Sequence, residues 1–350
     1  MTLPRVMSGW RLLRHGGPEA LAWSDAIPVP VPGPGQALIR VAAAGVNNTD
    51  INTRLGWYAR DVEGATGEAT GQNGGWSGAL TFPLIQGGDL CGHVVALGDG
   101  DEGPPVGARV TCPINQPEPT ADNPLAFVAL GSEYDGAFAQ FCTVPVRHLH
   151  DVTDSPLSDV QIAAMPCAFG TALNLLTRAG VGAGERVLVT GASGGVGLAA
   201  VALAHLKGAF VTGVTSASKA DAVRAAGAVA TLDRDADLPG GFDAVIDVVG
   251  GDGFAALIAA LRPGGRLAVS GAIAGPIARI DLRDLYLSDR TIIGCTHQSP
   301  KVFAELVAII NAGTLRPLIA DTYPLRDLPR AQADFQSKSR PGKLVLVPQE

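Results

Sequence analysis

The hydrophobic positions follow two different patterns along this chain. As far as about residue 151, short β-favouring runs are separated by proline and glycine turns, which is typical of a partly open, mainly β domain. From residue 157 onward helical periodicity appears, and strand-like and helix-like runs then alternate as far as residue 295. This alternation predicts a parallel sheet with helices on both faces. We therefore expect an α/β protein with two domains.

Strand and loop segments can be located within the first part. Four runs have the composition of strands, namely residues 37–43, 93–97, 109–111 and 137–144. Two stretches look like long loops, because residues 60–81 are rich in glycine and residues 113–123 are polar and contain proline. Loops of this length are either functional lids or tolerated surface insertions, and the sequence leaves both alternatives open.

The last part of the chain combines a helix over residues 300–311 with a β-like run over residues 342–348. This final strand is separated from the alternating region, so we expect it to pair within the first domain. We therefore predict a discontinuous β domain made of residues 1–152 and 296–350, and a nucleotide-binding domain made of residues 153–295. A length of 350 residues agrees with two domains, since a single hydrophobic core seldom grows so large.

The strongest motif is VLVTGASGGVG at residues 187–197, between a β-favouring run and an alanine-rich helical segment. Gly191 permits a sharp turn, Gly194 permits close approach of the backbone to a pyrophosphate, and Gly197 permits close packing of helix on strand. The alternative is a glycine-rich turn that binds no ligand. The predicted phosphate-binding residues are Gly191, Ser193, Gly194, Gly195, Val196 and Gly197.

The end of the second strand of this unit bears on the choice of cofactor. Folds that prefer NAD usually place an acid there, whereas this chain has TSASK at residues 215–219. A carboxylate would repel a 2′-phosphate, and hydroxyls, a helix N-terminus and an ammonium group would hold one. We therefore predict NADP(H), bound through Ser216, Ser218 and Lys219. In the alternative interpretation, the serines only cap a helix and the lysine is a solvated surface charge.

Charge and cysteine content narrow the class of protein. A net charge of −7 without a long basic run argues against nucleic acid as a partner. The 5 cysteines show no paired spacing and the first residues lack the apolar core of a signal peptide, so we expect a cytoplasmic protein. No run approaches the roughly 20 apolar residues of a membrane span, so we expect no membrane association.

Several motifs together resemble the medium-chain dehydrogenase/reductase superfamily. The resemblance rests on the order of a β domain and a dinucleotide unit, on VIDVVGG at residues 245–251, and on GKLVL at residues 342–346. It covers almost the whole chain and is greatest to the quinone oxidoreductase branch. It implies a GroES-like, mainly β substrate domain joined to a Rossmann-type, doubly wound parallel sheet.

Zinc-dependent members of this superfamily bind a catalytic metal through a cysteine, a histidine and a later cysteine. At the corresponding positions this chain has Asn47 in the phrase GVNNTD, Gly88 in the phrase GGD, and Cys167. A catalytic zinc needs three protein ligands, and the four-cysteine lobe of a structural zinc is also missing. We therefore predict no metal, and we interpret Cys167 as a small buried apolar residue rather than a nucleophile.

The lack of a Lewis acid limits the chemistry. Quinones and α,β-unsaturated carbonyls then accept hydride more easily than isolated ketones, because negative charge spreads over the conjugated oxygen. The predicted activity is NADPH-dependent reduction of a quinone or an enone, with a small-molecule electron acceptor as the partner. The alternatives are an alcohol or carbonyl dehydrogenase that works without metal or recruits it unusually, and a non-catalytic NADPH-binding protein.

The resemblance suggests which side chains face the acceptor. It places Asn47 in the active-site cleft and Tyr58 at its lip, where either could donate a hydrogen bond to a carbonyl oxygen. The alternative roles are a turn asparagine and a half-buried aromatic residue. Trp57, beside Tyr58, and Tyr134 are expected to border the substrate. His297 follows the last strand of the dinucleotide unit and is a candidate proton donor.

The nicotinamide end is expected at the carboxyl ends of the parallel strands, where doubly wound sheets bind their ligands. By resemblance, the residues there are Thr171, Val249, Gly250, Gly271, Ala272 and Ile273. Dimers are common in the superfamily, and we expect a homodimer formed through the last strand of the cofactor sheet, near residues 291–295.

Overall fold

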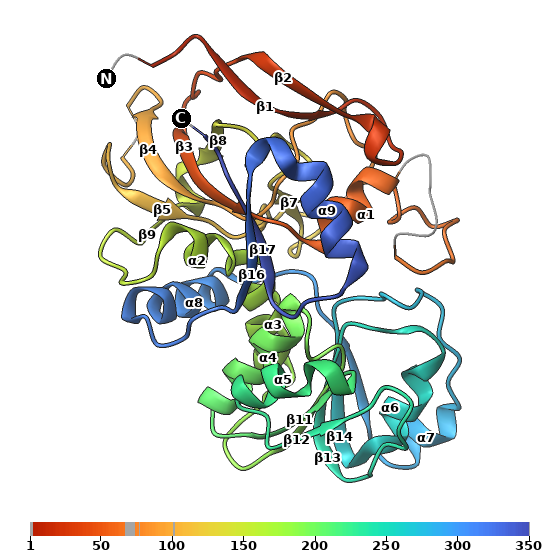
Figure 1. Cartoon of the computed structure of the whole chain (residues 1–350). Helices are drawn as coiled ribbons and strands as arrows, with labels where there is room; N and C mark the ends of the chain where they lie inside the picture. The colour runs from red at the N-terminus through yellow and green to blue at the C-terminus, as the bar shows by residue number, and fades with distance from the viewer. Residues whose placement is uncertain (1–2, 67–73, 77, 101, 350) are drawn as a thin grey trace.

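The computed structural model describes residues 3–66, 74–76, 78–100 and 102–349. It has a β-rich half that holds both ends of the chain, and a half built on a parallel sheet (Figure 1). Part of the glycine-rich stretch at residues 60–81 lies outside the described residues. Within the described ranges, no helix is long and apolar enough to cross a membrane.

The second half is organised around a parallel sheet that has six strands in the described chain. Numbered along the sequence they lie in the order 3-2-1-4-5-6, which is the order of a Rossmann-type sheet, and the predicted α/β fold class is confirmed. The order reverses between β10 and β13, so a ligand of such a fold binds outside their carboxyl ends. From edge to edge the strands are β12 (Ala230–Leu232), β11 (Phe210–Val214), β10 (Arg186–Val189), β13 (Phe242–Asp247), β14 (Leu261–Val269) and β15 (Thr291–Gly294).

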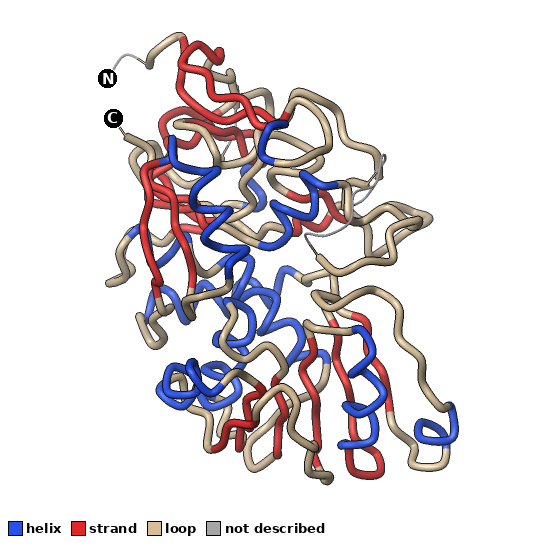
Figure 2. Tube along the Cα trace, turned by 45° about the vertical axis from the view of Figure 1, so that its right-hand side comes forward, coloured by secondary structure: helices blue, strands red, loops and turns tan. Residues whose placement is uncertain are grey.

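Helices pack against this sheet (Figure 2). The helix α4 is apolar almost all round, with the sequence GVGLAAVALAHL, so most of its side chains are buried against α3 and the sheet. The helices of this half and its junction are α2 (Asp159–Ala163), α3 (Pro166–Arg178), α4 (Gly195–Leu206), α5 (Ala220–Ala225), α6 (Phe254–Ala260), α7 (Leu282–Tyr286) and α8 (Pro300–Ala312).

One glycine fixes the distance between α4 and the strand before it. A Cβ added at Gly197 would lie 2.2 Å from the Gly191 carbonyl oxygen and 2.7 Å from the Ala192 Cα. These neighbours are backbone atoms, which cannot move aside as a flexible side chain can. The first turn of α4 therefore approaches the glycine-rich turn more closely than any other residue type would allow.

The β-rich half contains a mixed sheet in which both ends of the chain meet. The C-terminal strand β17 pairs antiparallel with β3, with Val345 opposite Gly45, so the last strand returns to the first part of the chain. The order is β16 (Ile319–Pro324), β17 (Lys343–Val347), β3 (Gln36–Gly45), β4 (Cys91–Leu97), β5 (Arg109–Thr111) and β9 (His150–Asp151), with β8 (Phe141–Pro145) also paired to β3.

Two hairpins and two helices complete this half. Its further elements are β1 (Val6–Leu12), β2 (Leu21–Pro28), β6 (Asn115–Pro117), β7 (Phe127–Ala129), α1 (Asn48–Leu55) and α9 (Leu328–Ser337). Short 3-10 turns occur in both halves. Those in the β-rich half are Pro18–Ala20, Val146–His148 and Leu325–Asp327, and those in the other half are Ala217–Lys219 and Gly251–Gly253.

Several details differ from the sequence-based expectations. The strand expected over residues 137–144 begins only at Phe141, because residues 137–139 pass beside β1 and form a single bridge between Ala139 and Gly9. The stretch 113–123 is not simply a loop, since it contains β6 and leads into β7. The helix α1 lacks an apolar stripe and is nevertheless buried, so periodicity alone does not reveal it.

We predict that Gly197→Ala lowers the free energy of unfolding by about 1–3 kcal/mol, because the added methyl group overlaps fixed backbone atoms. Equilibrium unfolding in urea, without cofactor, measures this change. Gly194→Ala is the matched control, since its φ is −80° and an added Cβ there would lie 3.4 Å from the nearest atom. Equal loss of stability in the two variants would contradict the steric argument.

Candidate active site

The glycine-rich turn leads from β10 into α4. Gly191 has a φ of +55°, a left-handed conformation that glycine adopts without strain. The Gly194 N–H donates to the Gly191 carbonyl oxygen at 2.9 Å and closes the turn. Gly194 is exposed, Gly195 and Val196 are half-buried, and Ser193 is buried. An exposed turn at the start of a helix presents unpaired N–H groups to an anion.

The end of β11 carries three hydroxyl side chains. Thr215 is 2% exposed, and its Oγ1 has no hydrogen-bond partner within the described chain. The hydroxyl oxygens of Ser216 and Ser218 lie 3.3 Å apart. Because buried hydroxyls are normally hydrogen-bonded, the unpaired Thr215 oxygen indicates that this position can receive a polar ligand group.

Positive side chains gather beside these hydroxyls. The Lys219 Nζ donates to the carbonyl oxygen of Lys338, which ends α9 in the other half of the molecule. Burial, followed by the charges of Arg234 and Lys338, lowers the pKa of Lys219. A phosphate group fits this set of donors, which consists of the cations Lys219, Arg234 and Lys338 and the hydroxyls of Ser216 and Ser218.

One buried aspartate holds the loops that follow β13 and β14. Asp247 is fully buried and accepts hydrogen bonds from Thr190 Oγ1 at 2.6 Å and from the N–H groups of Val249 and Gly250 at 3.0 Å each. The Ala274 N–H donates to the Val249 carbonyl oxygen at 2.8 Å. The backbone over residues 248–250 is thereby fixed against the loop over residues 271–275, which contains Gly271, Ala272 and Ile273.

The glycine-rich stretch of the β-rich half reaches the same loop. The Thr66 N–H donates to the Ile273 carbonyl oxygen at 3.1 Å. The Trp57 Nε1 donates to the Gly64 carbonyl oxygen at 3.0 Å, which ties this stretch to the end of α1. The described beginning of the stretch therefore connects the two halves at the predicted nicotinamide loop.

The opposite side of the candidate site lies where β3 ends and α1 begins. Asn47 is the N-cap residue of α1 and is 6% exposed. Its Nδ2 donates to Asp89 Oδ2 at 2.8 Å, and its Oδ1 accepts from Lys343 Nζ at 2.5 Å. Lys343 Nζ also donates to Asp89 Oδ2 and to the Val46 carbonyl oxygen, both at 3.0 Å. We call these three residues, Asn47, Asp89 and Lys343, the buried network. Its ion pair joins Lys343 to Asp89, and Asn47 is hydrogen-bonded to both.

All three positions that correspond to zinc ligands adjoin the buried network. Asn47 belongs to it, Gly88 precedes Asp89, and the Cys167 N–H donates to Asp89 Oδ1 at 2.6 Å in the first turn of α3. A Cβ added at Gly88 would lie 2.1 Å from Ile114 Cδ1. The isoleucine side chain thus fills the space that a histidine at this position would need.

Asp50 adds a second buried carboxylate to this corner. It is 4% exposed, and its Oδ2 accepts from the Asn47 N–H at 2.8 Å, which caps α1. Burial raises the pKa of Asp50 to about 7, the Asn47 hydrogen bond opposes this rise, and the nearby Asp89 charge adds to it. Asp50 therefore stabilises the helix start and holds a proton more readily than an ordinary aspartate.

Aromatic rings border the corner near Asn47. The Tyr58 hydroxyl donates to Thr49 Oγ1 at 3.0 Å, and burial raises the pKa of Tyr58 to about 12. The Tyr58 ring stacks on Trp76 with an interplanar angle of 2°, and Trp76 meets Phe127 edge to face. Trp57 meets Tyr58 edge to face as well. Trp76, from the glycine-rich stretch, therefore belongs to the wall of this corner.

Two other predicted residues have partners of their own. The Tyr134 hydroxyl donates to Gln116 Oε1 at 2.6 Å. His297 Nδ1 lies 3.2 Å from the Leu125 carbonyl oxygen, and the His297 carbonyl oxygen accepts from Asn174 Nδ2 at 3.1 Å. Among the described contacts, none joins either residue to Asn47 or Tyr58.

Cys167 has the surroundings of a structural thiol. It is 9% exposed, and burial, followed by the Asp89 charge, raises the pKa of its thiol far above the ordinary range. The half-buried Thr171, one turn further along α3, contacts this thiol. A thiol held in the protonated form is a poor nucleophile.

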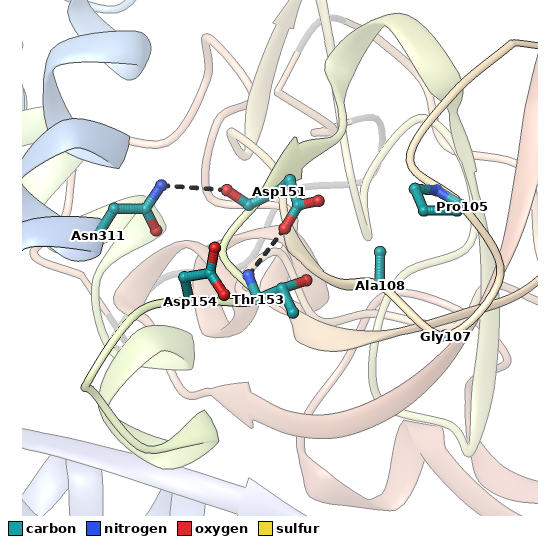
Figure 3. Close-up of a pocket in the computed structure, with 7 residues that line it drawn as sticks. All are labelled: Pro105, Gly107, Ala108, Asp151, Thr153, Asp154 and Asn311. Carbon is teal, nitrogen blue, oxygen red and sulfur yellow. Dashed lines mark hydrogen bonds between the residues drawn. The ribbon is translucent and has the colours of Figure 1, made fainter.

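A separate surface depression lies beside β9 and the end of α8 (Figure 3). Its lining includes Asp151, whose backbone oxygen accepts from Asn311 Nδ2 at 3.2 Å and whose carboxylate accepts from the Thr153 N–H at 2.8 Å. None of the predicted site residues lines it. We assign it no role in the chemistry.

Comparison with known proteins agrees with this architecture. The family model described as alcohol dehydrogenase GroES-like domain matches residues 33–154, and the one described as zinc-binding dehydrogenase matches residues 195–312. The structure of a candidate alcohol dehydrogenase from Sinorhizobium meliloti 1021 is 38% identical, with a TM-score of 0.89, and the match covers 99% of this chain and 98% of that one. The chain belongs to the medium-chain dehydrogenase/reductase superfamily.

Curated relatives indicate the branch. The quinone oxidoreductase of Mus musculus is 28% identical over 98% of each chain. The acryloyl-coenzyme A reductase of Metallosphaera sedula is 28% identical over 91% of this chain and 94% of its own. The protein is therefore a medium-chain oxidoreductase of the quinone oxidoreductase-like branch with a GroES-like and a Rossmann-type domain, and this family uses a nicotinamide dinucleotide.

Sequence reasoning about this medium-chain oxidoreductase missed three residues of the site. Asp89 and Lys343 were not selected, although a lysine at the start of the apolar run LVLV is a signal that its ammonium group needs a buried partner. Thr49 was also not selected, since nothing in the sequence shows that Tyr58 reaches it.

We expect Asp50→Asn to change how stability depends on pH. Between about pH 4 and pH 7 the folded protein binds a proton on Asp50 that the unfolded chain has released, so this residue makes folding less favourable as the pH rises. The variant lacks this penalty. The free energy of unfolding of the variant minus that of the original protein should therefore rise by roughly 3 kcal/mol as the pH goes from 4.5 to 7.5. Urea unfolding across this range measures the difference, and a difference that stays constant would refute the assignment.

Proposed function

We propose that this protein is an NADPH-dependent reductase that transfers hydride to a quinone or an enone without catalytic zinc. The observation that carries the proposal is the buried network of Asn47, Asp89 and Lys343 at the positions where zinc-dependent relatives bind their metal. The site faces a dinucleotide-binding sheet and offers hydrogen-bond donors for a carbonyl oxygen rather than a metal.

The cofactor half supports NADP(H) over NAD. The pyrophosphate would be held by the turn Gly191, Ser193, Gly194, Gly195, Val196 and Gly197, and the 2′-phosphate by Ser216, Ser218 and Lys219 with Arg234 and Lys338 beside them. The nicotinamide would lie against Thr171 and the loops of Val249, Gly250, Gly271, Ala272 and Ile273. When bound, NADPH supplies the hydride.

The residues at the three positions that correspond to zinc ligands support a mechanism without zinc. The Lys343 ammonium group already neutralises Asp89, and a divalent cation placed beside it would be repelled. Gly88 supplies no ligand, and Ile114 fills the space beside it. Cys167 alone then remains as a ligand, whereas a catalytic zinc needs three protein ligands.

Two hydrogen-bond donors can stabilise negative charge on the reduced acceptor. Asn47 offers an amide N–H directly. The Tyr58 hydroxyl stays protonated because burial raises its pKa to about 12, and it donates to Thr49 Oγ1, so Tyr58 acts through Thr49, whose own hydroxyl hydrogen is available for the acceptor. Trp57 and Tyr134 would border the acceptor, and His297 remains a candidate proton donor.

We also propose a cytoplasmic homodimer with the domain division predicted above. The strand β15 is at the edge of the cofactor sheet. Nearby apolar side chains are 56–70% exposed, namely Ile277, Leu282, Tyr286 and Leu287. An open strand edge beside exposed apolar residues favours pairing with a second copy of the chain. The 5 cysteines are free and buried, as in proteins of a reducing compartment.

The activity is tested by following NADPH oxidation with 1,4-naphthoquinone, an enone and a simple aldehyde, each with and without EDTA. We expect turnover of the quinone or the enone, unchanged by the chelator. Loss of turnover on chelation would contradict the zinc-free mechanism. NADPH binding without turnover of any acceptor would instead favour a non-catalytic binding protein.

The cofactor preference is tested by Lys219→Ala. Removing one charge-assisted contact to a phosphate costs about 1.5–3 kcal/mol, so the Kd for NADPH should rise roughly 10- to 100-fold while the Kd for NADH changes little. Fluorescence titration with both cofactors measures this. Lys207→Ala is the control, because Lys207 pairs with Glu305 away from the cofactor turn. An equal effect on both cofactors would show that Lys219 does not contact the 2′-phosphate.

A further inference from the structure

We propose that Lys343 is a positioning residue that locks the orientation of the Asn47 amide, so that Asn47 presents an N–H group, and not its oxygen, to the acceptor. The proposal rests on the proposed reductase function and adds a residue to its machinery. Lys343 does not touch the acceptor itself, because all three of its N–H donors have partners within the protein.

The two charges of the buried network determine the amide orientation. The Asn47 oxygen faces the Lys343 ammonium group at 2.5 Å, and the Asn47 Nδ2 faces the Asp89 carboxylate at 2.8 Å. A flipped amide would place its oxygen against a carboxylate and its NH₂ group against an ammonium group. Both contacts would be repulsive in a buried site, so only one orientation is stable.

This orientation leaves one donor available. The amide has two N–H groups, and Asp89 accepts one of them. Among the described residues, the only other acceptor recorded for Nδ2 is the Gly45 carbonyl oxygen at 3.5 Å, which is at the limit of hydrogen bonding. Within the protein the second N–H has only this long contact, and in our proposal it donates to the developing oxyanion.

Lys343 also connects the amide to the cofactor turn. A Cβ added at Gly195, the first residue of α4, would lie 2.9 Å from Lys343 Cδ, so the lysine stem passes directly against the start of this helix. The Lys343 backbone N–H is fixed in turn by the Leu318 carbonyl oxygen at 2.8 Å. One side chain thus links the phosphate-binding turn to the group that contacts the acceptor.

The decisive comparison makes Lys343→Met both in the original protein and in the Asn47→Ala variant. Methionine is chosen because its side chain keeps most of the apolar packing of the lysine stem. In the original protein we expect kcat for the quinone to fall at least about 10-fold, because an oxyanion donor is misplaced, while KM for NADPH stays within about 3-fold. In Asn47→Ala, the same change should alter kcat less than about 2-fold, because the oriented group is already missing. Equal losses in both backgrounds would overturn the proposal.

A second variant separates orientation from charge neutralisation. Lys343→Met leaves Asp89 buried without a partner, which is destabilising. Asp89→Asn combined with Lys343→Met removes both charges, and we expect its Tm to return toward the original value while kcat stays low. Recovery of kcat together with Tm would show that Lys343 only neutralises Asp89. Lys301→Met, at the exposed start of α8, serves as the matched control.

A readout without turnover distinguishes failure of this inference from failure of the reductase function. In protein labelled with ¹⁵N-asparagine, the Asn47 side-chain signal is identified by its loss in Asn47→Ala. We expect its N–H protons to exchange with water at least about 10-fold faster in Lys343→Met, because the charge-assisted hydrogen bond that fixes the amide oxygen is lost. An unchanged exchange rate would overturn the proposal even if the enzyme is active, and the measurement decides even if no acceptor is turned over.

Discussion

The ion pair between Lys343 and Asp89 joins four parts of the chain at one buried point. Lys343 comes from the last strand, Asp89 precedes β4, Asn47 starts α1, and the Cys167 N–H belongs to the first turn of α3. Two opposite charges are stable out of water only when each is paired and hydrogen-bonded. Removing either charge would leave the other buried without a partner at the point where the β-rich half meets the start of α3, which is also one wall of the candidate site.

The cofactor half relies on backbone rather than on charge. Gly191 and Gly197 allow the turn and α4 to approach closely, and Asp247 holds the neighbouring loops through their N–H groups. At the end of β11, by contrast, charged side chains gather, namely Lys219 with Arg234 and Lys338 beside it. This division is physically reasonable, because a pyrophosphate is recognised by N–H groups of fixed direction, whereas an added phosphate needs additional positive charge.

Much of the fold could be predicted because its signals are local. The alternation of strands and helices, the glycine spacing and the missing acid after β11 are all properties of short segments. Some elements, such as α1 and the hairpin of β1 and β2, lack a clear apolar period and give only a weak signal in the sequence. They are stable because tertiary contacts bury them, and α1 buries Asp50, Asn52 and Arg54 as well as apolar residues.

The sequence by itself determined the superfamily and the order of the two halves, and it pointed to the glycine-rich turn and to Asn47 and Gly88 at two positions where zinc-dependent relatives have ligands. It pointed to Asn47 as a candidate, but not to the partners of Asn47. Only the tertiary structure decided these, because Asp89 and Lys343 lie 42 and 296 residues away along the chain. The direction of an amide and the pairing of a buried charge are properties of contacts in space, and no local pattern in the sequence encodes them.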